Sequence, residues 1–312
     1  MPKRLIVERD DQRAALRQAL DTAFNALRKG AKVKFDFSPV VKIFPGGMLV
    51  FLAHMELMRL TFPDKLSLGV ARGSMASQLI SHFGIDILLG VQPSRSASKH
   101  ESVVNWRYLT GQGSDGEKIA TLLDSYKSHT DAEIPEGLYD VLAEAFTNVR
   151  HHAFPADRDV FDELKRWWLF SRYEAPKDGK LGNLYIAIYD IGVGIQNSLR
   201  TKLKTGELVL DKTDEILTLL NSQHSRRLER VLLKRAVEHE RSSTGLKNRG
   251  LGLPEMKEFV MRTPGGRLYI LSGEAQYSCI QEFGTGEVYE CPNGFPGTLI
   301  LWSLPLSNKE SS

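Results

Sequence analysis

The sequence is poor in cysteine, close to neutral in charge and without a long apolar run. Its two cysteines, Cys279 and Cys291, are too few for a disulfide framework or a cysteine metal site, so a reducing, cytoplasmic location is expected. The net charge of +3 gives no overall attraction to nucleic acid, although local basic patches leave nucleic acid undecided as a partner. The longest apolar stretch, 46–60, contains His54 and Glu56 and is too short to span a bilayer, so no membrane association is expected.

Length and composition favour a folded protein with two domains. The chain has 312 residues, of which 42% are hydrophobic and 25% charged. A stretch at 92–117 is rich in Ser, Gly and charged residues, as connections between domains often are. We expect an N-terminal α/β domain at 1–110, a linker at 111–130 and a second α/β domain at 131–306.

The first hundred residues alternate between helical and strand patterns. Residues 9–29 carry Leu16, Leu20, Ala23 and Leu27 at helical spacing and end at Gly30, which predicts an amphipathic helix. The elements expected after it are a strand at 33–37, a turn at Pro45–Gly47, a helix at 48–60, a strand at 65–71 and a helix at 73–83.

A helix over 135–153 places a carboxylate and an amide on one stripe. Its apolar residues recur with helical period, and Glu144 and Asn148 lie one turn apart beside them. An amide oxygen can complete the shell of Mg²⁺, and a carboxylate can orient or deprotonate an attacking water. The pair therefore suits nucleotide hydrolysis, but exposed helix edges often carry the same two residue types.

A strand at 184–189 delivers Asp190 to its end, followed by Ile-Gly-Val-Gly-Ile195. A fixed carboxylate can accept the exocyclic amino group of adenine, and Gly192 and Gly194 allow backbone to approach a flat ligand. An ordinary Asp-Gly turn is the alternative interpretation.

Two further patterns complete the set of candidate binding residues. Gly245–Leu253 leads into a helix at 254–261, and such glycine loops can cradle phosphate, here with positive charge from Lys247 and Arg249. Strands at 265–271 and 297–302 are expected to be antiparallel neighbours, with the Thr298 hydroxyl near an adenine edge. Glycine loops and surface threonines without any such role are also common.

The order of these four motifs resembles the GHKL superfamily of ATP-binding domains, which includes those of DNA gyrase and histidine kinases. The resemblance covers about 130–306 and implies an α/β sandwich with a mixed sheet and a long ATP lid. By that resemblance Glu144 activates water and Asn148 binds Mg²⁺, while Asp190 reads adenine with support from Thr298. The residues it implies for ATP binding are Asn148, Asp190, Gly192, Gly194, Ile195, Lys247, Arg249, Gly250, Leu251, Gly252, Leu253 and Thr298.

The same resemblance places the lid at 196–244, with helices expected at 214–220 and 226–240. The second of these is basic, through Arg226, Arg227, Arg230, Lys234 and Arg235, and forms either a solvated face or a contact with nucleotide, partner or nucleic acid. His151 occupies a position that is often basic and phosphate-binding in histidine kinases, and core packing is the alternative for His152.

The N-terminal pattern resembles the STAS fold of anti-sigma-factor antagonists. The resemblance rests on Asp36 to Gly47 followed by an apolar helix. Pro45, Gly46 and Gly47 stand where regulated members carry a phosphorylated Ser or Thr, so the resemblance implies a docking or dimerisation module rather than a phosphorylation switch.

Three functions remain open at this stage. The first is an ATPase switch in signalling, stress or defence that engages a protein partner or a second copy, which the intact Glu144 favours. The second is a histidine or serine protein kinase of two-component or anti-sigma type, for which His100-Glu101 offers a weak acceptor motif. The third is a non-catalytic scaffold, against which the presence of both Asn148 and Asp190 argues.

Overall fold

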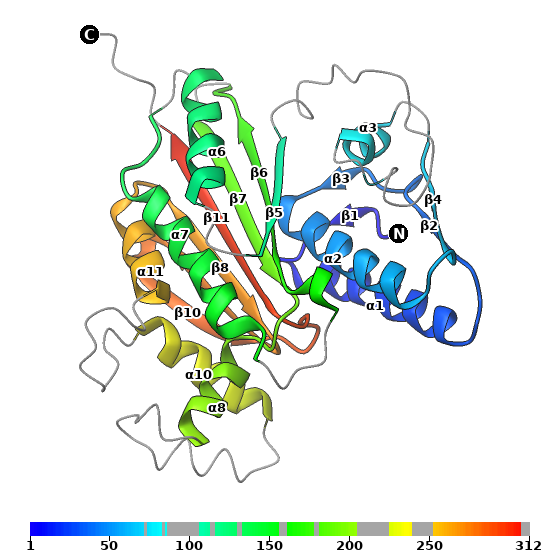
Figure 1. The fold of residues 1–312 in the computed structure, drawn as a ribbon. Helices are drawn as coiled ribbons and strands as arrows, with labels where there is room; N and C mark the ends of the chain where they lie inside the picture. Colours follow the sequence, from blue (N-terminus) through cyan, green and yellow to red (C-terminus); the bar gives the residue numbers. More distant parts are fainter. Residues whose placement is uncertain are drawn as a thin grey trace.

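The computed structural model describes residues 1–71, 74–82, 85, 106–112, 116–129, 133–155, 161–177, 181–204, 225–238 and 252–306. Within these ranges the chain forms an α/β fold around one large sheet (Figure 1). No helix in this part of the chain is long and apolar enough to cross a membrane.

The helices and strands of the described residues are interspersed in the N-terminal half, whereas four consecutive strands, β8 to β11, end the C-terminal half. The helices are α1 (Asp10–Arg28), α2 (Pro45–Thr61), α3 (Met75–His82), α6 (Gly116–His129), α7 (Leu138–Asn148), α8 (Ile195–Lys204), α10 (Ser225–Glu238) and α11 (Gly252–Arg262). The strands are β1 (Arg4–Leu5), β2 (Val33–Asp36), β3 (Lys42–Ile43), β4 (Leu66–Gly69), β5 (Trp106–Gly111), β6 (Trp167–Glu174), β7 (Gly182–Asp190), β8 (Arg267–Ser272), β9 (Ala275–Ile280), β10 (Thr285–Glu290) and β11 (Thr298–Leu306). A π-helical turn, η1 (Val149–Ala153), continues α7, and single 3-10 turns lie at Asp162–Leu164 and Gln281–Phe283.

The seven-stranded sheet has the order β10-β9-β8-β11-β7-β6-β5, and all of its strand pairs are antiparallel. The expectation of a mixed sheet is therefore wrong. The reason is local, because β6 with β7 and β8 with β9 are joined by short connections that reverse the chain. The only parallel pairs among the described residues are β1 with β3 and β2 with β4, in two small separate sheets.

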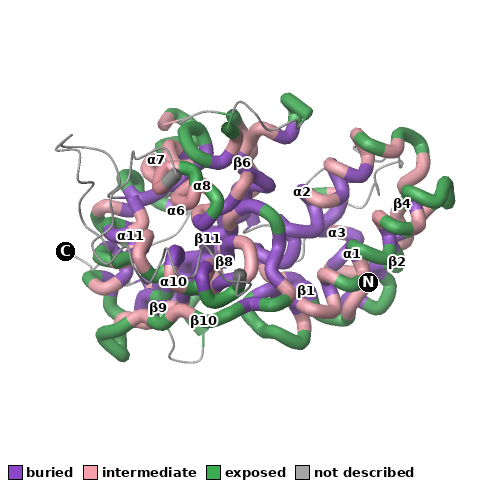
Figure 2. Tube along the Cα trace, turned by 90° about the horizontal axis from the view of Figure 1, so that it is seen from below, coloured by how far each residue is buried: buried purple, intermediate pink, exposed green. Residues whose placement is uncertain are grey.

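Both faces of the large sheet are covered, so the molecule has three layers (Figure 1). Helices α6, α7 and α11 cover one face, and α1 and α2 lie on the other. Two neighbouring residues of β6 point to opposite faces of the sheet. Trp167 stacks on Phe146 of α7 with ring centroids 3.9 Å apart, and the Trp168 indole N–H donates to the Glu56 carboxylate of α2 at 3.3 Å. Figure 2 shows the buried trace concentrated in the sheet strands and in α2.

The described residues of the range 111–130, which was expected to be a linker, belong to the sheet and to one of its covering layers. β5 ends at Gly111 and pairs with β6 along its length. α6 buries Ile119, Leu122 and Tyr126 in the same apolar cluster as α7. These apolar residues recur at helical spacing, so the sequence does contain a signal for the helix. The linker was predicted instead because the segment before the helix is polar.

The N-terminal third matches most of the predicted elements. The helix expected at 9–29 is α1, the strands expected at 33–37 and 65–71 are β2 and β4, and the helix expected at 73–83 is α3. Pro45–Gly47 is not a turn, because it forms the start of α2, with proline at a position where its missing N–H costs nothing.

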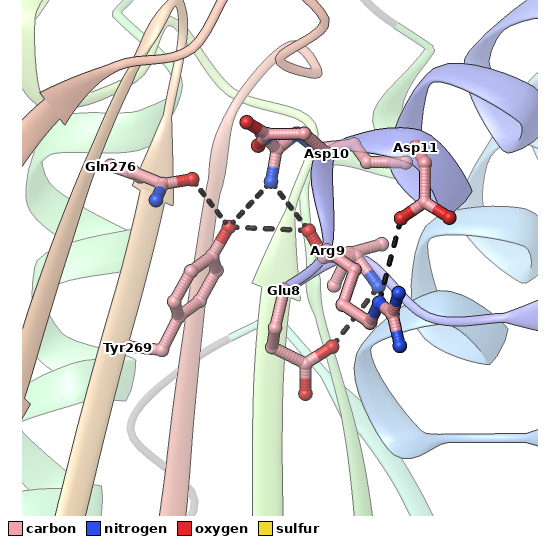
Figure 3. Close-up of polar contacts among 8 residues, drawn as sticks. Glu8, Arg9, Asp10, Asp11, Tyr269 and Gln276 are labelled. Carbon is pink, nitrogen blue, oxygen red and sulfur yellow. Dashed lines mark hydrogen bonds and ion pairs between the residues drawn. The ribbon is translucent and has the colours of Figure 1, made fainter.

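A buried arginine anchors this N-terminal layer to the edge half of the sheet. Arg13 of α1 donates to the Val7 carbonyl at 2.7 Å and to the Tyr269 hydroxyl of β8 at 3.0 Å, and it also pairs with Asp10. The same hydroxyl lies 3.2 Å from the Gln276 side-chain oxygen of β9 (Figure 3). Since Arg13 is only 1% exposed, its hydrogen bonds are formed away from water and fix where α1 meets the sheet.

We predict that Gly47→Ala destabilises the protein, although alanine is the better helix former by about 1 kcal/mol. A methyl group at Gly47 would lie 2.4 Å from the Leu5 carbonyl oxygen, which is backbone and cannot rotate away. Overpacking of this kind costs about 1–3 kcal/mol, so the net effect is a loss of stability in urea denaturation. Gly46→Ala is the matched control, since the atoms nearest to its methyl group belong to the side chains of Val7 and Leu301, which can adjust where backbone cannot. Equal stability of the two variants would contradict the close contact between α2 and β1.

Candidate functional site

Helix α7 and the start of α11 bring three predicted residues into contact. Glu144 and Asn148 lie one turn apart on α7, and both are half-buried. A Cβ atom on Gly252, the first residue of α11, would lie 2.5 Å from Glu144 Oε1 and 2.6 Å from Asn148 Nδ2. Any larger residue would push these two side chains aside, so the N-terminus of α11 lies directly against the carboxylate and the amide.

The end of β7 forms a tight turn against the end of the same helical segment. Asp190 is buried, and its carboxylate accepts the Gly192 N–H at 2.7 Å. The next N–H, of Val193, donates to the Ala153 carbonyl at 2.8 Å, at the last residue of η1. A side chain at Gly192 would meet that carbonyl oxygen at 2.4 Å. The segment that carries Glu144 and Asn148 therefore ends in contact with the turn that follows Asp190.

Ser272, which was not predicted, connects the end of β8 to the starts of β11 and α8 at this turn. Its hydroxyl accepts the Ile195 N–H at 2.9 Å, donates to the Gly297 carbonyl at 3.2 Å and lies 3.4 Å from the Thr298 hydroxyl. Thr298 is in register with Asp190 on one side and with Ser272 on the other. The hydroxyl pair thus stands at the ends of β8 and β11, beside the predicted carboxylate.

Gln196 is a second residue that sequence reasoning missed. It is 2% exposed, and its amide donates to the Ser272 carbonyl at 2.7 Å. Gly194, with a φ of +80°, allows the turn that places Ile195 and Gln196 at the start of α8. Ser272 had a weak sequence signal, because it ends an apolar strand directly before Gly273, whereas Gln196 had none beyond its position after the glycine motif.

Burial raises the pKa of the Glu144 carboxyl above its ordinary value of 4.5, and the nearby Glu255 carboxylate raises it further. Glu255 lies in the first turn of α11, so the two carboxylates approach each other across the helix contact. A raised pKa makes Glu144 a stronger base once it is ionised, which is the property that proton abstraction from water requires.

The remaining predicted residues divide into those placed elsewhere and those not described. Leu253 is half-buried against the apolar cluster of α7 and α11. His151 and His152 are both exposed on η1, so packing of His152 in the core is wrong. The basic helix expected at 226–240 is α10, and α8 precedes it in the predicted lid. Lys247, Arg249, Gly250 and Leu251 lie outside the described residues, as do the helix expected at 214–220 and His100.

The arrangement offers hard oxygen donors but no complete metal site. Among the residues that the structure describes, no group of three or more His, Cys, Asp or Glu side chains could hold a metal ion. One amide and one carboxylate suit a cation such as Mg²⁺ that takes most of its ligands from water and phosphate oxygens. The site is chemically suited to an anionic ligand that brings its own cation.

Comparison of the sequence with protein-family models gives no match, and comparison with curated proteins gives none either.

We predict a pH-dependent stability gain in Glu144→Gln. The unfolded carboxyl ionises near its ordinary pKa of 4.5, and the folded one only at higher pH, so ionisation between the two values favours the unfolded chain. The wild-type protein is therefore most stable below the pKa of the unfolded Glu144 carboxyl. It loses stability as the pH rises through the pKa of the folded one. Urea denaturation should show no pH-dependent difference well below pH 4.5, and the variant should gain on the wild type as the pH rises above that value.

A Glu255→Gln background tests the cause of this shift. It removes the second carboxylate, so the gain from Glu144→Gln should shrink but persist, because burial is the larger cause. A stability difference between Glu144→Gln and wild type that does not change with pH would rule out a raised pKa at this position.

Proposed function

We propose that this protein binds ATP with Mg²⁺ and hydrolyses it. One observation carries the proposal: the carboxylate and amide of α7 lie against the first residue of α11, and the same helical segment ends against the turn after Asp190. Residues that are distant in sequence are thus brought to one helical segment, with the Glu144 carboxylate along it and the Asp190 turn at its end. That arrangement suits a ligand with a hydrogen-bonding base and a phosphate chain.

Asp190 and Thr298 are assigned to the adenine end. The carboxylate accepts the exocyclic amino group, and the Thr298 hydroxyl, paired with Asp190 across β7 and β11, supports the carboxylate or a water beside the base. Gly192 and Gly194 keep side chains away from the plane of the base. The Ser272 hydroxyl fixes the two strand ends relative to each other.

Glu144, Asn148 and Gly252 are assigned to the phosphate end. The N–H groups at the start of α11 and the positive end of its dipole favour phosphate, and Lys247 and Arg249 precede it closely in sequence. Asn148 supplies an amide oxygen to Mg²⁺, whose charge offsets that of the phosphates. Glu144 orients and deprotonates the water that attacks the terminal phosphate.

The resemblance to the GHKL superfamily supports the same assignment, because it gives these residues the same roles in the same order. The all-antiparallel sheet departs from the mixed sheet that the resemblance implies, so the proposed function rests on the residues of the site and not on strand direction. We assign the α8 and α10 region to a lid that responds to nucleotide. The N-terminal layer, with its resemblance to the STAS fold, is then the part that engages a protein partner or a second copy.

We predict that Asp190→Asn weakens ATP binding by about 10- to 100-fold, the range expected when a hydrogen bond to a charged group is lost. Asparagine keeps an oxygen for the Gly192 N–H, so the turn is preserved. Isothermal titration calorimetry with MgATP measures the effect. Asp162→Asn is the matched control and should bind ATP like the wild type, because that side chain is 88% exposed on a separate turn.

We predict further that Glu144→Ala retains ATP binding and lowers hydrolysis by about 100- to 10,000-fold, the usual contribution of a general base. The fate of γ-labelled phosphate separates the alternatives. Free phosphate released by the wild type and not by Glu144→Ala supports the ATPase. Label retained on the protein would instead identify a kinase, and undiminished turnover in Glu144→Ala would remove Glu144 from its role.

A further inference from the structure

The connection between β10 and β11, residues 291–297, contacts the end of β7 that carries Asp190. It begins at Cys291, whose N–H donates to the Glu274 carbonyl at 2.7 Å, and leads into Thr298. It is packed closely against the sheet: a Cβ atom on Gly294 would lie 1.7 Å from the Gly273 carbonyl oxygen, and one on Gly297 would lie 1.8 Å from that of Asp190. Any shift of this connection therefore moves backbone that touches Asp190.

Helix α1 holds the connection from the N-terminal layer. The Arg17 guanidinium donates to the Gly294 carbonyl at 2.6 Å and lies over the Phe295 ring, 5.9 Å from its centroid. Its other side pairs with Asp21 at 2.8 Å, which fixes the guanidinium in orientation. One side chain of α1 thus contacts two consecutive residues of the connection.

Helix α2 and strand β7 hold the same connection from beneath. The Tyr189 hydroxyl donates to the Pro296 carbonyl at 2.7 Å, and the His54 ring of α2 stacks on Tyr189 with centroids 6.2 Å apart. His54 also meets the edge of Phe295 at 5.6 Å. Burial lowers the pKa of His54 to about 4, so the ring is neutral at pH 7 and packs without a charge.

These contacts form a continuous path from the N-terminal layer to the candidate site. Arg17, His54 and Tyr189 each touch one or two of the residues Gly294, Phe295 and Pro296. Gly297 then accepts the Ser272 hydroxyl, and Thr298 is in register with Asp190. None of the three holding residues is among those assigned to the ligand.

We infer that Arg17 and Tyr189 are positioning residues for the base end of the site, and that the N-terminal layer sets ligand affinity by holding residues 294–296. This inference rests on the proposed function for its ligand. It assigns to the N-terminal layer a direct part in nucleotide recognition, in addition to any partner that it engages.

The test compares Arg17→Met and Tyr189→Phe with the wild type in calorimetric titrations of MgATP, MgADP and MgGTP. Each variant removes one hydrogen bond to the connection, so affinity for ATP and for ADP should fall by the same factor, about 2- to 10-fold. Because the displacement affects the end that reads the base, affinity for GTP should change less, and selectivity for ATP over GTP should fall. A general loosening of the fold would lower all three affinities equally and leave selectivity unchanged.

Two further variants complete the comparison. Arg17→Lys retains a donor for the Gly294 carbonyl and should recover most of the lost affinity. Arg28→Met makes the same substitution as Arg17→Met at an exposed position near the end of α1, and should match the wild type. Unchanged selectivity in both Arg17→Met and Tyr189→Phe, with ATP bound by the wild type, would overturn the inference.

Hydrogen exchange separates this inference from the proposed function. Without any ligand, the amides of residues 294, 295 and 297–299 should exchange faster in Arg17→Met than in wild type or Arg28→Met. If the wild type binds no nucleotide, the proposed function fails, and exchange alone decides whether the N-terminal layer holds the connection. Equal exchange in all three proteins would overturn that part as well.

Discussion

Burial of the central sheet on both faces is the constraint on which the rest of the structure depends. The centres of β6 and β7 are apolar and buried on both faces, at 167–170 in β6 and 186–189 in β7, so neither strand has a face there that water could cover. Each large side chain of this kind gains roughly 1.5–3 kcal/mol on burial. The sheet therefore requires α6, α7 and α11 on one side and α1 and α2 on the other, and the positions of those helices decide where the candidate site lies.

The same constraint explains which elements the sequence could predict. Helices α1, α7, α10 and α11 have one apolar face each, and their period identified them. β6 was missed because Trp167 to Phe170 is apolar without alternation, as expected for a strand that contacts two layers. β9 was missed although Ala275, Tyr277 and Cys279 alternate with polar residues and are buried, whereas β10 is largely exposed and carries no such pattern. α2 was predicted to begin too late because Gly46 and Gly47 are turn residues in most contexts.

The candidate site was predictable in its residues more than in its contacts. The order of Glu144, Asn148, Asp190 and Thr298 followed from local patterns, and the structure brings Glu144 and Asn148 against Gly252. Ser272 and the Ala153 carbonyl could not be foreseen, because each acts through a contact between segments far apart in sequence. Such contacts depend on strand register, which a single sequence specifies only through the packing of all layers together.

Neighbouring residues at the end of β7 face opposite layers, with Asp190 at the candidate site and Tyr189 against His54 of α2. Because β7 contacts both layers, removing either layer would expose apolar residues of the strand to water. The N-terminal third is consequently not expected to separate from the rest of the protein as an independent domain. Its removal would expose Trp168 and Phe170 and leave an apolar sheet face prone to aggregation. Gain or loss of this segment by recombination would therefore require compensating substitutions on the sheet face that it covers. We expect the N-terminal third and the sheet to be inherited as one unit.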